Sequence, residues 1–95
     1  MFARVTEYKM KSGSRDAATE KLNAMKSQIM AMPGMLQFVN VMNEDGTGYV
    51  VALVESEEVS NTNAEAAAAA WAQFSDLLEA TPSPNGYDVI ANWTN

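Results

Sequence analysis

The sequence predicts a single α+β domain spanning residues 1–95, with elements in the order β-α-β-β-α-β. Three observations lead to this fold class. The chain has 95 residues, the length of one small domain. Two segments, at about residues 18–32 and 64–78, carry apolar residues at helical spacing. Between them, a turn containing Asp45-Gly46, a dipeptide typical of β-hairpins, separates two strand-like segments.

The first half of the chain predicts one strand and one helix. Residues 2–10 alternate between polar and apolar side chains, as a strand does. Ser14 suits the N-cap of the following helix, and Asp16 lies in its first turn. Pro33-Gly34 ends the helix. Its apolar stripe, spaced four, three, four and three residues apart, is formed by Ala18, Leu22, Met25, Ile29 and Met32.

The second half predicts a hairpin, a helix and a last strand. Residues 35–43 and 49–54 are the predicted hairpin strands. The polar segment 55–63 is predicted as an irregular lead-in to the helix. Thr62 and Glu65 fit a capping box, although Asn63 could be the cap instead. The helix is predicted to reach about Ala80, with a stripe of Ala64, Ala67, Trp71, Phe74 and Leu78. A turn at 81–86 leads to the last strand, 87–93.

Right-handed β-α-β crossovers place both helices on one face of a four-stranded antiparallel sheet, which is a ferredoxin-like arrangement. The other face should also be apolar. In the third strand Tyr49, Val51 and Leu53 point to one side, and Val50, Ala52 and Val54 to the other. In the second strand Leu36, Phe38 and Met42 are expected on one side of the sheet, and Met35, Val39 and Val41 on the other. Since strands with two apolar faces are typically buried on both, the sequence predicts a homodimer through the open sheet face.

Composition excludes several classes of function. The chain has 12 acidic and 6 basic residues, a net charge of −6, and no basic cluster that would bind nucleic acid or an anionic membrane. It has no cysteine and no histidine, which excludes disulfides, thiolate or imidazole metal sites, and Ser-His-Asp or Cys-His catalysis. The apolar runs are too short to span a bilayer, and residues 1–10 lack the apolar segment of a signal peptide, so a cytoplasmic location is expected.

Three motifs carry a resemblance to a known family. They are Met32-Pro33-Gly34-Met35 before the second strand, Asp45-Gly46 in the hairpin, and Val54-Glu55-Ser56-Glu57-Glu58 after the third strand. With this order of elements, the chain resembles the dimeric α+β barrel superfamily, and within it the antibiotic biosynthesis monooxygenase-like group. That superfamily includes cofactor-free quinol oxygenases, haem-degrading enzymes, isomerases and ligand-sensing modules, so the resemblance predicts a fold and leaves the activity open.

The resemblance carries over to few residues. Oxygenase members are similar to one another in placing an Asn, a Trp and often a His around a pocket between sheet and helices. Trp71 fits the helix Trp approximately, whereas Thr6 and Glu7 occupy the region of the first-strand Asn. The absence of histidine disfavours the haem-degrading branch, which depends on an axial His. Cofactor-free oxygenation stays open, because an electron-rich substrate anion can reduce oxygen itself, and no cofactor is expected.

Five residues are candidates for contacting a small apolar or aromatic ligand, and each also has a structural interpretation. Trp71 could line a pocket or fill the core. Asn40 could bind a ligand or a backbone group. Tyr8 could orient a phenol or simply suit a strand. Arg4 could clamp an anion or pair with an acid of a partner subunit. Trp93 is expected on the last strand.

Other residues bear on the presence of a pocket or a base. Ala64, Ala67 and Ala68 could leave a cavity or let the helix pack closely. Glu7 could act as a base if it were buried among apolar groups. Three functions therefore remain: a cofactor-free oxygenase, a non-catalytic ligand-binding or sensor module, and an interaction protein with a filled core.

Overall fold

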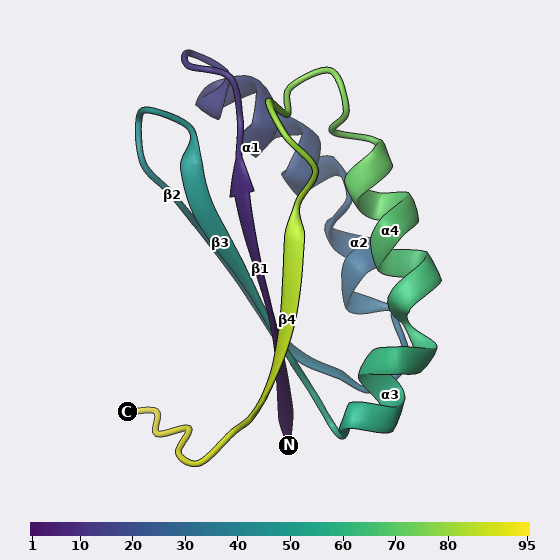
Figure 1. The fold of residues 1–95 in the computed structure, drawn as a ribbon. Coiled ribbons are helices and arrows are strands. Elements are labelled where there is room, and N and C mark those ends of the chain that lie inside the picture. Colours follow the sequence, from purple (N-terminus) through teal and green to yellow (C-terminus); the bar gives the residue numbers. More distant parts are fainter.

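The computed structural model describes all 95 residues, and its sheet and helices form two layers (Figure 1). The elements are β1 (Phe2–Lys9), α1 (Arg15–Ala24), α2 (Lys26–Met30), β2 (Met35–Met42), β3 (Thr47–Val54), α3 (Glu57–Thr62), α4 (Ala64–Ala72) and β4 (Ser83–Asp88). The strands are antiparallel in the order β2-β3-β1-β4, and the helices all lie on one face of the sheet. The predicted α+β fold class is confirmed. No helix is both long and apolar enough to cross a membrane.

The predicted first helix is divided into α1 and α2 at Met25. The N–H of Met25 bonds to the carbonyl of Leu22, three residues back, at 2.9 Å. This tighter turn interrupts the α-helical pattern without turning the stripe away from the sheet, since Met25 and Ile29 are both buried. No Gly or Pro marks this break in the sequence, so the stripe alone predicted one helix.

The polar segment after β3 is a helix, and its prediction as irregular was wrong. The hydroxyl of Ser56 accepts a hydrogen bond from the N–H of Val59 at 3.2 Å and so caps α3, with Glu57 and Glu58 in the first turn. The predicted capping box at Thr62 does not form. Asn63 occupies the N-cap position of α4, but its side-chain amide donates to the carbonyl of Pro33 at 2.8 Å instead.

The last helix and strand both differ from their predicted positions. Helix α4 ends at Ala72, eight residues before the predicted end at Ala80. Strand β4 begins at Ser83, within the predicted turn, and ends at Asp88. Pro84 is compatible with β4 because this strand lies at the sheet edge, where one side needs no ladder hydrogen bond. Trp93 therefore lies in the tail after the sheet, 92% exposed, and not on a strand.

Strand register decides which side chains face the helices. Asn40 and Thr6 both pair with Val50, so these three form one row on the helix-facing side. Phe38, Ala52 and Arg4 form the next row. A register shift between Met35 and Gln37 corrects one prediction: Met35 lies on the same side as Phe38, and Leu36 is left 47% exposed.

The opposite side of the sheet is the outer face, and it is largely apolar. Its rows run Val41–Tyr49–Glu7, Val39–Val51–Val5 and Leu53–Ala3–Tyr87. Val39, Val41, Tyr49 and Tyr87 are all exposed on this face. The predicted sidedness of β3 is confirmed, because Val50, Ala52 and Val54 are buried beneath the helices while Tyr49 is exposed.

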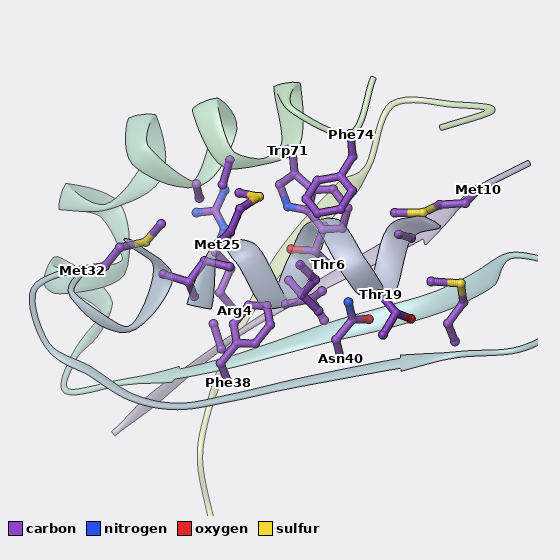
Figure 2. A pocket seen from close by; sticks show the side chains of 18 of the residues that line it. Arg4, Thr6, Met10, Thr19, Met25, Met32, Phe38, Asn40, Trp71 and Phe74 are labelled. Atoms are coloured by element: carbon purple, nitrogen blue, oxygen red, sulfur yellow. The ribbon is translucent and has the colours of Figure 1, made fainter. Parts of the chain in front are cut away.

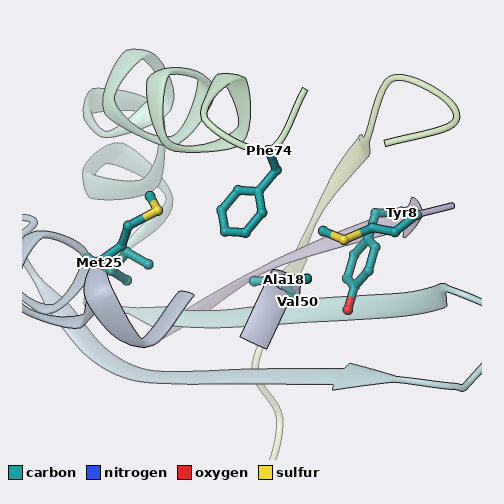
Figure 3. Packing of buried hydrophobic residues seen from close by; sticks show 7 residues of the cluster. Tyr8, Ala18, Met25, Val50 and Phe74 are labelled. Atoms are coloured by element: carbon teal, nitrogen blue, oxygen red, sulfur yellow. The ribbon is translucent and has the colours of Figure 1, made fainter. Parts of the chain in front are cut away.

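The core lies between the helices and the inner side of the sheet (Figure 3). Its buried cluster consists of Tyr8, Met10, Ala18, Met25, Ile29, Val50 and Phe74. Leu22, Met35, Phe38 and Trp71 pack against this cluster and are only partly buried. Space remains within this core, because every residue of the buried cluster except Tyr8 also lines a cavity.

Candidate ligand-binding site

The cavity within the core has a volume of about 310 Å3. Fifteen of its twenty lining residues are hydrophobic. Arg4, Thr6, Phe38 and Asn40 rise from the sheet, and Trp71 and Phe74 face them from the helix side (Figure 2). The volume is at the lower end of the range for small-molecule sites, roughly 300–1,000 Å3. The small residues Ala67 and Ala70 of α4 line its roof, which explains how space remains beneath that helix.

Tyr8 and Asn40 form a partly buried hydrogen bond beside the cavity. The Tyr8 hydroxyl donates to Oδ1 of Asn40 at 2.6 Å, and it lies 3.1 Å from the carbonyl oxygen of Val41. A separation of 2.6 Å suits an O–H···O bond better than an N–H···O bond, which supports the oxygen of Asn40 as the acceptor. The amide nitrogen of Asn40 is then directed toward the cavity (Figure 2).

The environment of Tyr8 keeps its phenol neutral. Burial raises the pKa of Tyr8, and the hydrogen bond to Asn40 only partly offsets that effect. Because a phenol with a raised pKa stays protonated at neutral pH, Tyr8 cannot serve there as a general base. It acts on the cavity by fixing the orientation of Asn40.

Trp71 is the aromatic wall of the cavity. Its ring centroid lies 5.3 Å from that of Tyr8 and 6.2 Å from that of Phe74, with tilted planes in both pairs. Such aromatic contacts hold the indole in place. The other side of Trp71 lines a second hollow of about 490 Å3 near β4, which also includes Arg4 and Thr6. Trp71 therefore stands between the cavity and a more open hollow.

Arg4 is one of two charged residues that line the cavity; the other, Arg15, lies toward solvent. Its register neighbours on the inner side of the sheet are Ala52 and Gly86, neither of which carries an acid. The single ion pair of the chain joins Arg15 to Glu44 at 3.8 Å and does not involve Arg4. Arg4 is partly buried as a residue, and its guanidinium forms no ion pair with a carboxylate of the chain.

Four of the five sequence-predicted residues come together in the structure. Arg4, Asn40 and Trp71 line the cavity, and Tyr8 supports it through Asn40. Trp93 is not among the residues that line the cavity. Other lining residues were not predicted. Thr6 and Phe38 are two of them, and inward alternation along the first and second strands is the signal that could have found them.

The cavity offers hydrogen-bond donors and no obvious base. Glu7, the predicted candidate for a base, is exposed on the outer face and pairs with Tyr49. No Asp or Glu is among the lining residues, and no group of three potential metal ligands exists in the structure. The arrangement can bind and orient a small molecule and keep water away from it. The cavity wall has no carboxylate or imidazole that could remove a proton from that molecule.

Several solved structures have the same fold as this chain over nearly its whole length. A protein of unknown function from Nitrosomonas europaea is 19% identical and superposes with a TM-score of 0.81 over 99% of this chain and 93% of that one. A proposed antibiotic biosynthesis monooxygenase from Nitrosomonas europaea is 17% identical, with a TM-score of 0.75 over 96% of this chain and all of that one. The chain has the antibiotic biosynthesis monooxygenase-like fold.

This fold is also found in a mutant of MhuD solved with two manganese protoporphyrin IX molecules bound per active site. That structure is 16% identical to this chain, with a TM-score of 0.78 over the full length of both. A scan of known protein families finds no match to the sequence, and no curated protein matches it. Because the structural neighbours are below 20% identity, the antibiotic biosynthesis monooxygenase-like fold is what they establish.

Proposed function

We propose that the chain binds a small aromatic ligand in the cavity beneath Trp71, and that it oxygenates a phenolic or quinol-type ligand without a cofactor. The observation that supports this is the apolar cavity itself, about 310 Å3 in volume, between the sheet and α4. Phe38, Trp71 and Phe74 supply aromatic surface for a flat ligand, and Asn40 supplies an oriented donor.

The proposed reaction balances without a redox group in the protein. A phenol and dioxygen give a quinone and water: one oxygen atom bonds to a ring carbon as its C–H bond breaks. The second oxygen leaves as water, with the protons of the phenol and of that ring carbon. The ligand supplies the four electrons that reduce dioxygen. The chain contributes a water-poor site and hydrogen-bond donors to the oxygen that carries negative charge.

A porphyrin is not part of this proposal, because the donor set does not suit one. Haem iron is held in proteins by His, Cys, Met or Tyr. The chain has neither His nor Cys, and the hydroxyl of Tyr8 is engaged with Asn40. Methionine would be the remaining ligand, and no methionine is distinguished from the others that line the cavity.

We propose further that the protein works as a homodimer through the outer face, and that it resides in the cytoplasm, as the sequence predicts. The exposed side chains of Val39, Val41, Tyr49 and Tyr87 support the dimer, because an apolar sheet surface of this kind is costly to leave in water. Sedimentation analysis should give twice the chain mass. Val39→Glu should give the monomer mass, while Ala69→Glu, an exposed position of α4, should stay dimeric. A monomeric wild-type chain would refute the dimer.

The test of the function has two steps. Calorimetric titration with naphthols, quinols and aromatic acids should show saturable binding to one class, weakened by Trp71→Ala. Oxygen consumption is then measured with the ligands that bind. One molecule of oxygen should be used per quinone formed, and no hydrogen peroxide should be released, since the second oxygen atom leaves as water. Binding with oxygen uptake no faster than in buffer would refute the oxygenase and leave the binding function. Absence of binding across the panel would refute both.

A second candidate is a non-catalytic binding or sensor module. It is favoured by one observation: the cavity wall contains no carboxylate and no histidine, while Tyr8 is kept protonated. A ligand that must lose a proton before it reacts would find no base in this cavity, so the cavity would bind it without reaction. Binding without turnover is the result that this candidate predicts.

A further inference from the structure

We propose that the natural ligand is a planar aromatic anion whose negatively charged oxygen is bound by Arg4, with Thr6 and Asn40 as the neighbouring donors. This deepens the proposed function and rests on it, since it requires that the cavity beneath Trp71 be the binding site. The charge on the cavity wall, the lack of a partner for Arg4, and the lack of a base lead to this ligand class.

The charge of the cavity wall is opposite to that of the whole protein. The chain has 12 acidic and 6 basic residues, yet two arginines and no acid line the cavity. Arg15 lies toward solvent and pairs with Glu44 at 3.8 Å, so water and this carboxylate screen its charge. Arg4 is thus the uncompensated charge of the wall, and its positive potential acts in an apolar space where electrostatic interactions are stronger than in water.

The position of Arg4 leaves its guanidinium available to a ligand. Its neighbours across the sheet, Ala52 and Gly86, have no side chain that could accept a hydrogen bond. Two acids lie nearby: Asp88 is one register row away on β4, and Glu79 lines the second hollow that Arg4 also lines. Neither forms an ion pair with Arg4. A partly buried guanidinium cannot shed its charge and is stabilised by an acceptor. A ligand oxyanion in the cavity would be such an acceptor.

Further donors lie beside Arg4 on the inner side of the sheet. Thr6 is two residues along β1, and Asn40 lies in the same register row as Thr6, on the other side of Val50. Because Tyr8 occupies the oxygen of Asn40, the amide nitrogen is left to donate into the cavity. Figure 2 shows Thr6 and Asn40 on the sheet side, opposite Trp71 and Phe74, and the side chain of Arg4 extending from the sheet toward the helices. A flat ring can rest against the aromatic side while its oxygen meets the donors.

The lack of a base points to a ligand that arrives already ionised. Neither Asp, Glu nor His lines the cavity, and the phenol of Tyr8 is committed to Asn40. Aromatic carboxylates, and phenols acidic enough to ionise in water, meet this requirement. Both present the same chemistry to Arg4, an oxyanion on a flat ring, and bidentate or charge-assisted bonds to arginine favour that group over a neutral amide or alcohol.

The experiment compares ligands that differ only in charge. Calorimetric titration of the wild-type protein with 2-naphthoate and 2-naphthamide should show the anion binding about tenfold more tightly or better, as expected for a charge-assisted contact. A second arm titrates 4-nitrophenol above and below the pKa of its own hydroxyl; tighter binding of the phenolate identifies phenolates as ligands besides carboxylates. Both arms use the unmodified chain, so neither depends on how a variant folds.

Variants then assign the preference to Arg4. Arg4→Gln should abolish the preference for naphthoate by weakening naphthoate binding far more than naphthamide binding. Arg4→Lys should keep part of the preference. Lys26→Gln removes one positive charge at an exposed position outside the cavity and is the control that should keep all of it. Equal binding of naphthoate and naphthamide by the wild type would overturn the inference while the proposed binding site stands. Equal weakening of naphthoate and naphthamide binding by Arg4→Gln would likewise overturn the inference and leave the proposed binding site standing. Failure of every probe to bind would overturn the binding site and this inference together.

Discussion

The hydroxyl of Tyr8 donates to Oδ1 of Asn40 at 2.6 Å, across 32 positions of the sequence. This bond joins β1 to β2 over the intervening strand β3 and fixes the orientation of the Asn40 amide. Tyr8 is almost fully buried, at 3% exposure, while Asn40 reaches the cavity. The core and the candidate site are thus connected through one side-chain pair.

Tyr8→Phe tests this pair. Removing the hydroxyl leaves Asn40 without its partner, so the free energy of unfolding should fall by about 1–2 kcal/mol, as for other buried hydrogen bonds. Ligand affinity should fall several-fold because the amide can turn. Chemical denaturation and calorimetric titration measure the two effects. Ser27→Ala removes an exposed hydroxyl of α2, away from the cavity and the outer face; it is the control and should lower neither quantity.

The raised pKa of Tyr8 predicts a specific loss of stability at alkaline pH. Since burial raises the pKa of Tyr8 in the folded protein, the unfolded chain releases this proton first, at about pH 10, the ordinary tyrosine value. The contribution to stability is complete below that pH and is lost as pH rises toward the folded pKa. Denaturation midpoints should therefore fall more steeply above about pH 10 in the wild type than in Tyr8→Phe. Parallel slopes would contradict this account of Tyr8.

Gly46 and Gly13 form a matched pair for testing the hairpin. Both have positive φ angles, +94° and +84°, which residues with a side chain rarely adopt. A Cβ at Gly46 would collide with the carbonyl oxygen of Met10, while one at Gly13 would meet nothing within 4 Å. Thermal denaturation should show a loss of about 1 kcal/mol for Gly13→Ala and about 3 kcal/mol or more for Gly46→Ala. Equal losses would mean that backbone conformation alone governs both positions.

Filling the cavity should separate ligand binding from stability. Ala67 lines the cavity, whereas Ala66 is exposed on the same helix. In Ala67→Leu the added methylene groups should occupy apolar space, so ligand affinity should fall by about tenfold or more while stability is kept or raised. Ala66→Leu should bind as the wild type does. Unchanged affinity in Ala67→Leu, measured by calorimetry, would place the ligand elsewhere.

The sequence predicts the order of the elements because their periodicity is local. The stripe through Ala18 and Ile29, and the Asp45-Gly46 turn, need no knowledge of distant contacts. The predicted boundaries of the last strand were wrong because they depend on tertiary contacts. Ser83 to Asp88 forms a strand because β1 offers it an edge, although two prolines and a glycine in residues 82–86 favour a turn locally. The α3 cap at Ser56 was a signal present in the sequence and missed.

The candidate site was only partly predictable for similar reasons. Arg4, Tyr8, Asn40 and Trp71 were singled out by their chemistry within apolar segments, and the fold brings them together. That Arg4 lacks a partner could not be foreseen, because it depends on the register that places Ala52 and Gly86 beside it. The position of Trp93 could not be foreseen because it depends on where β4 ends. The exposure of Glu7 could not be foreseen because it depends on which side of the sheet meets the helices.

The most direct test of the binding site is a fluorescence titration of Trp93→Phe, in which Trp71 is the single remaining tryptophan. Trp93 is 92% exposed in the tail, so its replacement should leave the fold intact. With correction for absorption by the ligand, 2-naphthoate should quench Trp71 emission in a saturable curve whose midpoint agrees with calorimetry. Trp71 emission that stays unchanged while calorimetry reports binding would place the ligand away from the cavity and contradict the account.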